Sequence, residues 1–161
     1  MTTIKVLFVC LGNICRSPMA DGVFGHMVKE AGLADKITVE SAGTGSWHVG
    51  EKAHPGTRKV LAAHDIPYDG RARQFTTDDL DTFDYVLAMD HSNLTNIQRL
   101  GLGDPHRAEV RKFLAYANDA ELTDVEDVPD PYYTGGFDYV YDLVEKASQA
   151  LLDHIRKQHN L

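Results

Sequence analysis

Residues 9–18 bring a cysteine and an arginine together at a spacing that suits phosphate chemistry. The segment reads Val-Cys-Leu-Gly-Asn-Ile-Cys-Arg-Ser-Pro, so five residues separate Cys10 from Arg16. A loop of this length can curl until its backbone N–H groups point inward and form a nest for an anion. A helix that begins at Ser17 and Pro18 would add its positive dipole end at the same point. Because a guanidinium can also grip two phosphate oxygens, the segment predicts a site for a tetrahedral dianion.

Cys10 would lie at the centre of this nest, where it could act as a nucleophile. A helix N-terminus and a neighbouring cation both favour the thiolate, which is the reactive form of cysteine. The Ser17 hydroxyl could donate a hydrogen bond to that thiolate and help it leave in a later step. A cysteine at the end of a buried strand can also be a simple core residue. The strand before it, the Ser-Pro pair after it and the Gly-Asn pair within the loop together favour catalysis.

The residues that follow Cys10 are expected to surround the phosphate group. Gly12 permits backbone angles that other residues resist, and Asn13 tolerates a positive φ better than most. The expected phosphate-binding residues are Leu11, Gly12, Asn13, Ile14, Cys15, Arg16 and Ser17.

The elements that must position this loop alternate between strands and helices. An apolar, β-branched run predicts a strand at residues 4–9, and further strands are expected at residues 37–40, 85–89 and 111–115. Helical spacing and capping signals predict helices at residues 17–32, 55–65, from 90 onward and 137–157. This order is typical of an α/β fold with a parallel sheet covered on both faces, and ligands bind beyond the carboxyl ends of its strands. We expect a single domain over residues 1–161, with its site at residues 10–17, 41–45 and Asp90.

The composition narrows the classes of function. The 161 residues include 24 acidic and 16 basic side chains, and the formal net charge of −8 disfavours nucleic acid and anionic membrane as partners. The apolar run at residues 4–10 is far shorter than the ~20 residues of a membrane span. Only Cys10 and Cys15 are cysteines, so a reducing, cytoplasmic location is expected. The eight histidines show no ligand-like spacing, and neither a metal nor a cofactor is expected.

Residues 9–18 resemble the phosphate-binding loop of the low-molecular-weight protein tyrosine phosphatases. The resemblance extends over nearly the whole chain, through similar segments at residues 41–47, 55–57, 61–66, 89–90 and 130–133. It implies a four-stranded parallel sheet flanked by helices in three layers, with the phosphate-binding loop after the first strand. It also implies hydrolysis of phosphotyrosine in proteins, or of small aryl phosphates, through a phosphocysteine on Cys10.

The resemblance assigns the general acid and base to Asp130, in the segment Asp-Pro-Tyr-Tyr at residues 130–133. An oxygen leaving group needs a proton donor, and the same carboxylate can later take a proton from water. From the residues alone, Asp130 could equally be a turn residue before a proline. Acidic residues crowd positions 119–130, and like charges favour a protonated acid. We therefore expect a rate optimum on the acidic side of neutrality.

Other residues are assigned to the pocket wall and to support of the loop. Leu11, Trp47 and Tyr132 are expected to line a slot for an aromatic ring. The resemblance implies that the loop is held in shape by hydrogen bonds among Asn13, Ser17, Ser41 and His64. Asp90 could orient Arg16 or cap the next helix, and the sequence leaves both open.

Two other functions are consistent with a phosphate nest. A thiol-dependent arsenate reductase would use the same loop, but no cysteine follows Cys15 to resolve the intermediate, so an external thiol would be needed. A non-catalytic phosphopeptide-binding module would not need the nucleophile and the acid that this chain keeps. Cys10 and Cys15 could form a reversible disulfide on oxidation, and phosphorylation of Tyr132 or Tyr133 stays open. The oligomeric state is not set by the sequence, and a monomer is favoured.

Overall fold

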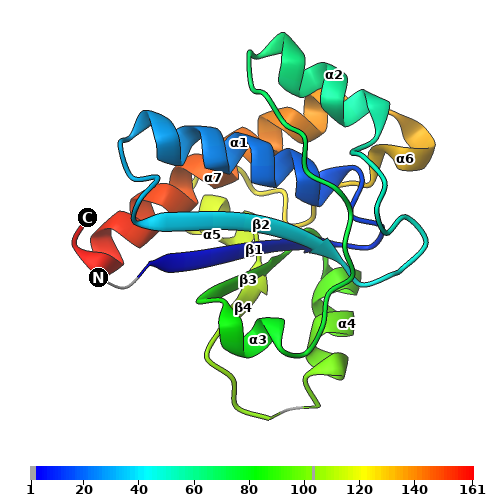
Figure 1. Cartoon of the computed structure of the whole chain (residues 1–161). Helices are drawn as coiled ribbons and strands as arrows, with labels where there is room; N and C mark the ends of the chain where they lie inside the picture. The colour runs from blue at the N-terminus through cyan, green and yellow to red at the C-terminus, as the bar shows by residue number, and fades with distance from the viewer. Residues whose placement is uncertain (1–2, 103) are drawn as a thin grey trace.

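Four parallel strands form the centre of the molecule. The computed structural model describes residues 3–102 and 104–161 (Figure 1). The strands are β1 (Ile4–Cys10), β2 (Ile37–Gly43), β3 (Tyr85–Ala88) and β4 (Glu109–Lys112), in the order β2-β1-β3-β4. All three pairings are parallel, which confirms the predicted α/β class and the four-stranded sheet.

Helices cover both faces of this sheet (Figure 1). On one side lie α1 (Arg16–Glu30), α5 (Leu114–Asp119) and the long α7 (Phe137–His159), with α2 (Pro55–Ala63) packed against α1 and α7. On the other lie α3 (Asp79–Thr82) and α4 (His91–Leu100). The short α6 (Pro131–Thr134) lies beside α2 at the edge where the site forms. The three predicted layers are therefore present.

β1 is apolar along most of its length because both of its faces are buried. Val6 and Phe8 pack toward α1 and α7, whereas Leu7 and Val9 pack toward α3 and α4, and all four are fully buried. The Phe8 ring makes edge contacts with Phe24 of α1 and with Phe113 just before α5, at centroid distances of 5.7 and 4.8 Å. This packing fixes the end of β1 relative to the start of α1, and so the two ends of the loop between them.

Two element boundaries differ from the prediction in ways that matter. The first helix begins at Arg16, and Cys15 rather than Ser17 is its N-cap; the Ser17 hydroxyl bonds to side chains of the site instead of capping the helix. The fourth strand covers Glu109–Lys112, and residues from Leu114 onward form a helix. Phe113 lies between them, buried in the core, so the segment predicted as one strand is split between two elements. Within the described residues, no helix is long and apolar enough to cross a membrane.

Candidate active site

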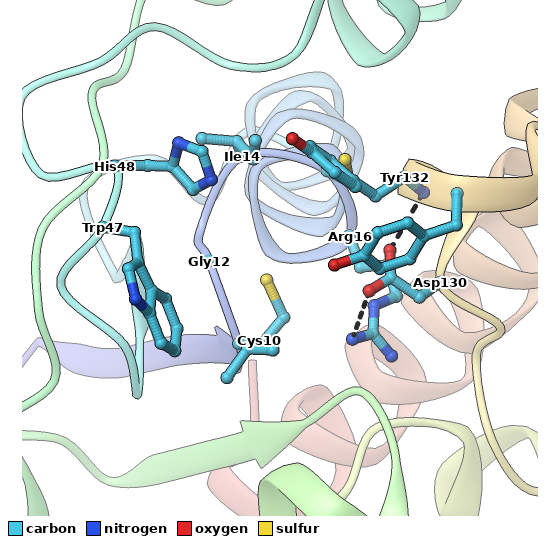
Figure 2. A pocket seen from close by; sticks show the side chains of 11 residues that line it. Cys10, Gly12, Ile14, Arg16, Trp47, His48, Asp130 and Tyr132 are labelled. Carbon is cyan, nitrogen blue, oxygen red and sulfur yellow. Dashed lines mark hydrogen bonds and ion pairs between the residues drawn. The ribbon is translucent and has the colours of Figure 1, made fainter.

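A pocket of about 420 Å³ opens at the carboxyl edge of the sheet, between the β1–α1 loop and the segment that leads into α6 (Figure 2). Figure 2 shows the Cys10 side chain pointing into the space between Trp47 and Asp130. The pocket is lined by Cys10, Leu11, Gly12, Ile14, Cys15, Arg16, Trp47, His48, Asp130, Tyr132 and Tyr133. Residues far apart in the sequence, predicted separately as nucleophile, cation, acid and wall, thus meet in one pocket.

The Cys10 thiol is held by a hydroxyl behind it. Its Sγ lies 3.0 Å from Ser17 Oγ, which accepts a hydrogen bond of 2.8 Å from Asn13 Nδ2. The Ser17 proton can point to Cys10 Sγ or to the Ala42 carbonyl oxygen, which is farther away at 3.4 Å. A thiolate at Cys10 would therefore receive a hydrogen bond from Ser17, as the sequence predicted.

Asn13 ties the loop to two neighbouring segments. Its φ of 57° is in the left-handed region, which asparagine tolerates. Its amide nitrogen donates to Ser17 and, at 3.0 Å, to Ser41 Oγ, and its Oδ1 accepts from the Arg73 backbone N–H at 2.9 Å. The side chains of Asn13 and Ser17 are buried, and neither residue is among those that line the pocket, so these side chains support the loop from behind.

The loop also needs a glycine on the adjacent strand. A Cβ atom at Gly43 would lie 2.7 Å from the Leu11 carbonyl oxygen and 3.0 Å from the Asn13 backbone nitrogen. Gly43 is the last residue of β2 and pairs with Cys10 in the sheet. Only glycine therefore lets β2 approach the phosphate-binding loop this closely.

Arg16 is buried beneath the pocket, and its position is fixed from two directions. Its Nη1 donates to Asp90 Oδ2 at 2.6 Å and to the Val128 carbonyl at 2.9 Å. Asp90 also accepts from the Asn93 backbone N–H through Oδ1 at 2.7 Å, so Asp90 both orients Arg16 and caps α4. Burial lowers the pKa of Arg16, but the charges of Cys10, Asp90 and Asp130 outweigh it and raise that pKa above its usual value. Arg16 is therefore a permanent cation at the pocket.

Asp130 lies at the rim of the pocket, on the side of Arg16 (Figure 2). Its Oδ2 is 3.6 Å from Arg16 Nη2, and its Oδ1 accepts from the Tyr132 backbone N–H at 3.0 Å as the N-cap of α6. Asp130 is therefore a turn residue before a proline, and it also lies at the pocket, where a general acid would have to be. Two of the acidic residues expected to surround Asp130 form ion pairs with other side chains: Asp119 pairs with Arg111, and Asp127 pairs with Lys112.

Aromatic side chains form an exposed wall around the pocket. Trp47 is 70% exposed and Tyr132 is 45% exposed, and Leu11 lies at the rim with them. The Trp47 ring covers Gly45 so closely that a Cβ there would be 1.9 Å from it. His48, which the sequence analysis did not single out, also lines the pocket and pairs with Glu51. In the sequence, only its position directly after Trp47 indicated that His48 could line the pocket.

The prediction for His64 is wrong. His64 is exposed, and its ring stacks on Tyr141 of α7 at a centroid distance of 3.8 Å, not beneath the phosphate-binding loop. The helix on which it was expected to reach the loop ends at Ala63, and His64 caps it. Ser41 has Tyr68 beside it instead, with 3.5 Å between the two hydroxyl oxygens.

Tyr68 and Asp21 extend the support of the loop, and sequence reasoning missed both. The Tyr68 hydroxyl donates to Asp21 Oδ2 at 2.9 Å. Polar contacts therefore run from Asp21 through Tyr68, Ser41, Asn13 and Ser17 to Cys10. Burial of the Asp21 carboxyl, only partly offset by hydrogen bonds from Tyr68 and Ser41, raises its pKa to about 7. The available signal was helical spacing, because Asp21 follows Ser17 by four residues in α1.

Cys15 is a second free thiol at the pocket. Burial, followed by the charges of Asp130 and Cys10, raises its pKa to about 12. Cys15 therefore stays protonated at neutral pH, and a protonated thiol is a poor nucleophile. Among the residues that the structure describes, no three histidine, cysteine or carboxylate side chains are grouped so that they could hold a metal ion.

The chain is similar to members of one protein family along nearly its whole length. The family model described as low molecular weight phosphotyrosine protein phosphatase matches residues 5–161. The protein-tyrosine-phosphatase YfkJ of Bacillus subtilis is 44% identical over 159 residues, which cover 98% of this chain and 99% of that protein. Its crystal structure matches with a TM-score of 0.93 over 99% of this chain and 98% of that one. An arginine phosphatase from Drosophila is also similar, at 32% identity and a TM-score of 0.86, over 95% of this chain and 98% of that one.

Proposed function

Because the chain belongs to the low molecular weight phosphotyrosine protein phosphatase family, we propose that it hydrolyses phosphotyrosine through a covalent phosphocysteine on Cys10. One observation carries the proposal: Cys10, Arg16 and Asp130 line a single pocket with an aromatic rim. The family match over residues 5–161 also supports one catalytic domain over the whole chain.

The first step transfers the phosphoryl group to the enzyme. The phosphate would sit in the β1–α1 loop, with its oxygens held by backbone N–H groups and by the Arg16 guanidinium. The Cys10 thiolate attacks phosphorus, the S–P bond forms and the P–O bond to the aromatic ring breaks. The electron pair leaves with the phenolic oxygen, which takes a proton from the Asp130 carboxyl.

The second step returns the enzyme to its starting state. A water molecule attacks the phosphocysteine, and the Asp130 carboxylate takes one of its protons. The S–P bond breaks, inorganic phosphate forms and the thiolate departs as the leaving group. The Ser17 hydroxyl, 3.0 Å from Cys10 Sγ, stabilises the negative charge that returns to sulfur.

The rim of the pocket supports an aryl phosphate as the substrate. Trp47 and Tyr132 can pack against a phenyl ring, and Cys10 is buried below them. A phosphoserine would place its phosphate too near the peptide backbone to reach the sulfur. We therefore expect the enzyme to hydrolyse small aryl phosphates in addition to phosphotyrosine in proteins. A reducing, cytoplasmic location and a monomer remain predictions from the sequence.

The rival functions predict different results in one assay. We expect hydrolysis of p-nitrophenyl phosphate at mildly acidic pH in the presence of a chelator, and no activity for Cys10→Ser. A phosphopeptide-binding module would bind phosphotyrosine peptide without turnover. An arsenate reductase would consume arsenate only with an added thiol. Faster release of phosphate from a phosphoarginine peptide than from a matched phosphotyrosine peptide would overturn the proposed substrate while keeping the phosphatase.

A further inference from the structure

A second hollow adjoins the active-site pocket on the far side of Tyr132. This flanking groove has a volume of about 640 Å³ and shares Ile14, His48 and Tyr132 with the pocket. It is lined by Ile14, His48, Glu51, Lys52, Ala53, His54, Pro55, Arg58 and Tyr132. The Tyr132 ring is near two histidine rings, at centroid distances of 6.2 Å from His48 and 5.8 Å from His54. A chain bound in the pocket can therefore continue into the groove over these rings.

The groove carries two cations that the protein itself leaves unpaired. Neither Lys52 nor Arg58 forms an ion pair with any residue that the structure describes. Arg58 is nevertheless held in place, because its Nε donates to the Ala53 carbonyl at 3.0 Å and leaves its terminal nitrogens available. The one acidic residue of the groove, Glu51, is paired with His48 at 2.9 Å.

The start of α2 adds to this positive character. The groove is lined by His54, the N-cap of the helix, by Pro55, its first residue, and by Arg58 in its first turn. The His54 Nδ1 accepts from the Gly56 backbone N–H at 2.9 Å, so the neutral ring carries its proton on Nε2 and can donate a hydrogen bond without adding charge. A helix N-terminus favours a negative group. The chain as a whole has a formal net charge of −8, so the two cations of the groove stand out against a negative background.

We propose that the flanking groove binds the carboxylate of an aspartate or glutamate near the phosphotyrosine in a protein substrate. The inference rests on the proposed function, because it concerns the same substrate chain. The rings at the shared rim are 6.2 Å (His48 to Tyr132) and 5.8 Å (Tyr132 to His54) apart. Since an extended polypeptide advances about 3.3–3.6 Å per residue, the acidic side chain would be within about three positions of the phosphotyrosine. Two cations beside a pocket that already binds a dianion would then select acidic phosphopeptides from neutral ones.

The test compares peptides that differ only in this charge. Phosphotyrosine peptides carry glutamate or glutamine within about three positions on either side of the phosphotyrosine, and kcat/KM is measured for each. Lys52→Met and Arg58→Met each remove one cation and keep much of the side-chain volume. Lys59→Met is the matched control, since Lys59 is an exposed lysine on α2 that does not line the groove.

We expect the wild type to prefer a glutamate peptide over its glutamine partner, and this preference to weaken with added salt. Lys52→Met and Arg58→Met should each reduce the preference by about two- to fivefold, as is usual for an exposed ion pair, and Lys59→Met should keep it. Glu51→Gln should increase it.

Equal rates for glutamate and glutamine peptides in the wild type would overturn the proposal, as would the same loss of preference in all three methionine variants. Hydrolysis of p-nitrophenyl phosphate by the wild type is measured alongside. Its absence would refute the proposed function itself, and the groove proposal with it. Its presence together with equal peptide rates would refute the groove alone.

Discussion

At the scale of single residues, the chemistry of Cys10 depends on groups that do not line the pocket. The side chains of Ser17 and Asn13 lie behind the pocket, and those of Ser41 and Tyr68 lie behind them. These side chains fix the direction of the Ser17 hydroxyl and the shape of the nest. Side chains that do not line the pocket should therefore affect turnover when they are changed.

Asp130→Ala should slow turnover of aryl phosphates by about 10²- to 10⁴-fold, the usual contribution of a general acid. The loss should be larger for phenyl phosphate than for p-nitrophenyl phosphate, because a poorer leaving group needs the proton more. The variant should also lose the limb of the pH–rate profile that the acid sets. Steady-state rates for both substrates across pH provide the measurement. An unchanged profile would remove Asp130 from this role.

Asp21 makes a specific prediction for stability against pH. Its folded-state pKa of about 7 is above the ordinary value of 3.8, so the folded state binds this proton more tightly than the unfolded state. The resulting stabilisation is full below the unfolded pKa and is lost as the pH rises through about 7.

The free energy of unfolding of the wild type should therefore fall between about pH 5 and about pH 8 by more than that of Asp21→Asn. Urea unfolding of each protein at both pH values measures how far its free energy of unfolding falls. All other titrating groups are common to the two proteins and cancel in the comparison. Equal differences for the two proteins would show that Asp21 titrates at its ordinary pKa.

At the scale of elements, the approach of β2 to the phosphate-binding loop sets the geometry of the nest. Gly43→Ala should reduce kcat/KM by roughly 10- to 100-fold, because its Cβ must push the Leu11 carbonyl and Asn13 aside. Gly25→Ala is the matched control. Gly25 lies inside α1, and nothing is within 4 Å of its Cβ position. It should keep full activity and gain roughly 0.5–1 kcal/mol of stability.

Thermal unfolding and p-nitrophenyl phosphate kinetics separate the two effects. If Gly43→Ala kept wild-type kcat/KM, the close approach of β2 would not be needed for the nest. If Gly25→Ala lost as much activity as Gly43→Ala, the effect would not be specific to the loop.

The elements show which parts of the fold can be predicted from the sequence. β1 was predictable because a strand buried on both faces leaves an unbroken apolar run, and α7 because its apolar stripe keeps helical period over many turns. The boundary at Phe113 was not, since one buried aromatic suits a strand end and a helix start equally.

In the site, residues close together in the sequence could be predicted, whereas contacts between distant residues could not. Cys10, Arg16 and Ser17 lie in one continuous loop, so their spacing carried the prediction. Helical spacing could have placed Asp21 near Ser17, but Tyr68 and Asp21 are 47 positions apart, and no local pattern marks the contact between them. His64 was misplaced because its role was transferred by resemblance, whereas in this chain a tyrosine hydroxyl lies beside Ser41.

At the scale of the whole molecule, the chain carries a net negative charge, whereas positive side chains are grouped at the site. The formal net charge is −8, yet Arg16 is buried at the pocket and Lys52 and Arg58 line the groove beside it. The parallel sheet positions Arg16, because the β1–α1 loop and the Asp90 cap both follow the carboxyl ends of its strands. Anionic substrates are thus expected to bind at this edge and not over the surface in general.

The most direct test of the whole account is rapid acid quenching of Asp130→Ala during turnover of p-nitrophenyl phosphate, followed by mass spectrometry of the intact protein. Without the base for the second step, the variant should accumulate a species heavier by one phosphoryl group, and peptide mapping should place that group on Cys10. An adduct on another residue would contradict the account. So would phosphate release by this variant at a measurable rate with no covalent intermediate at any time.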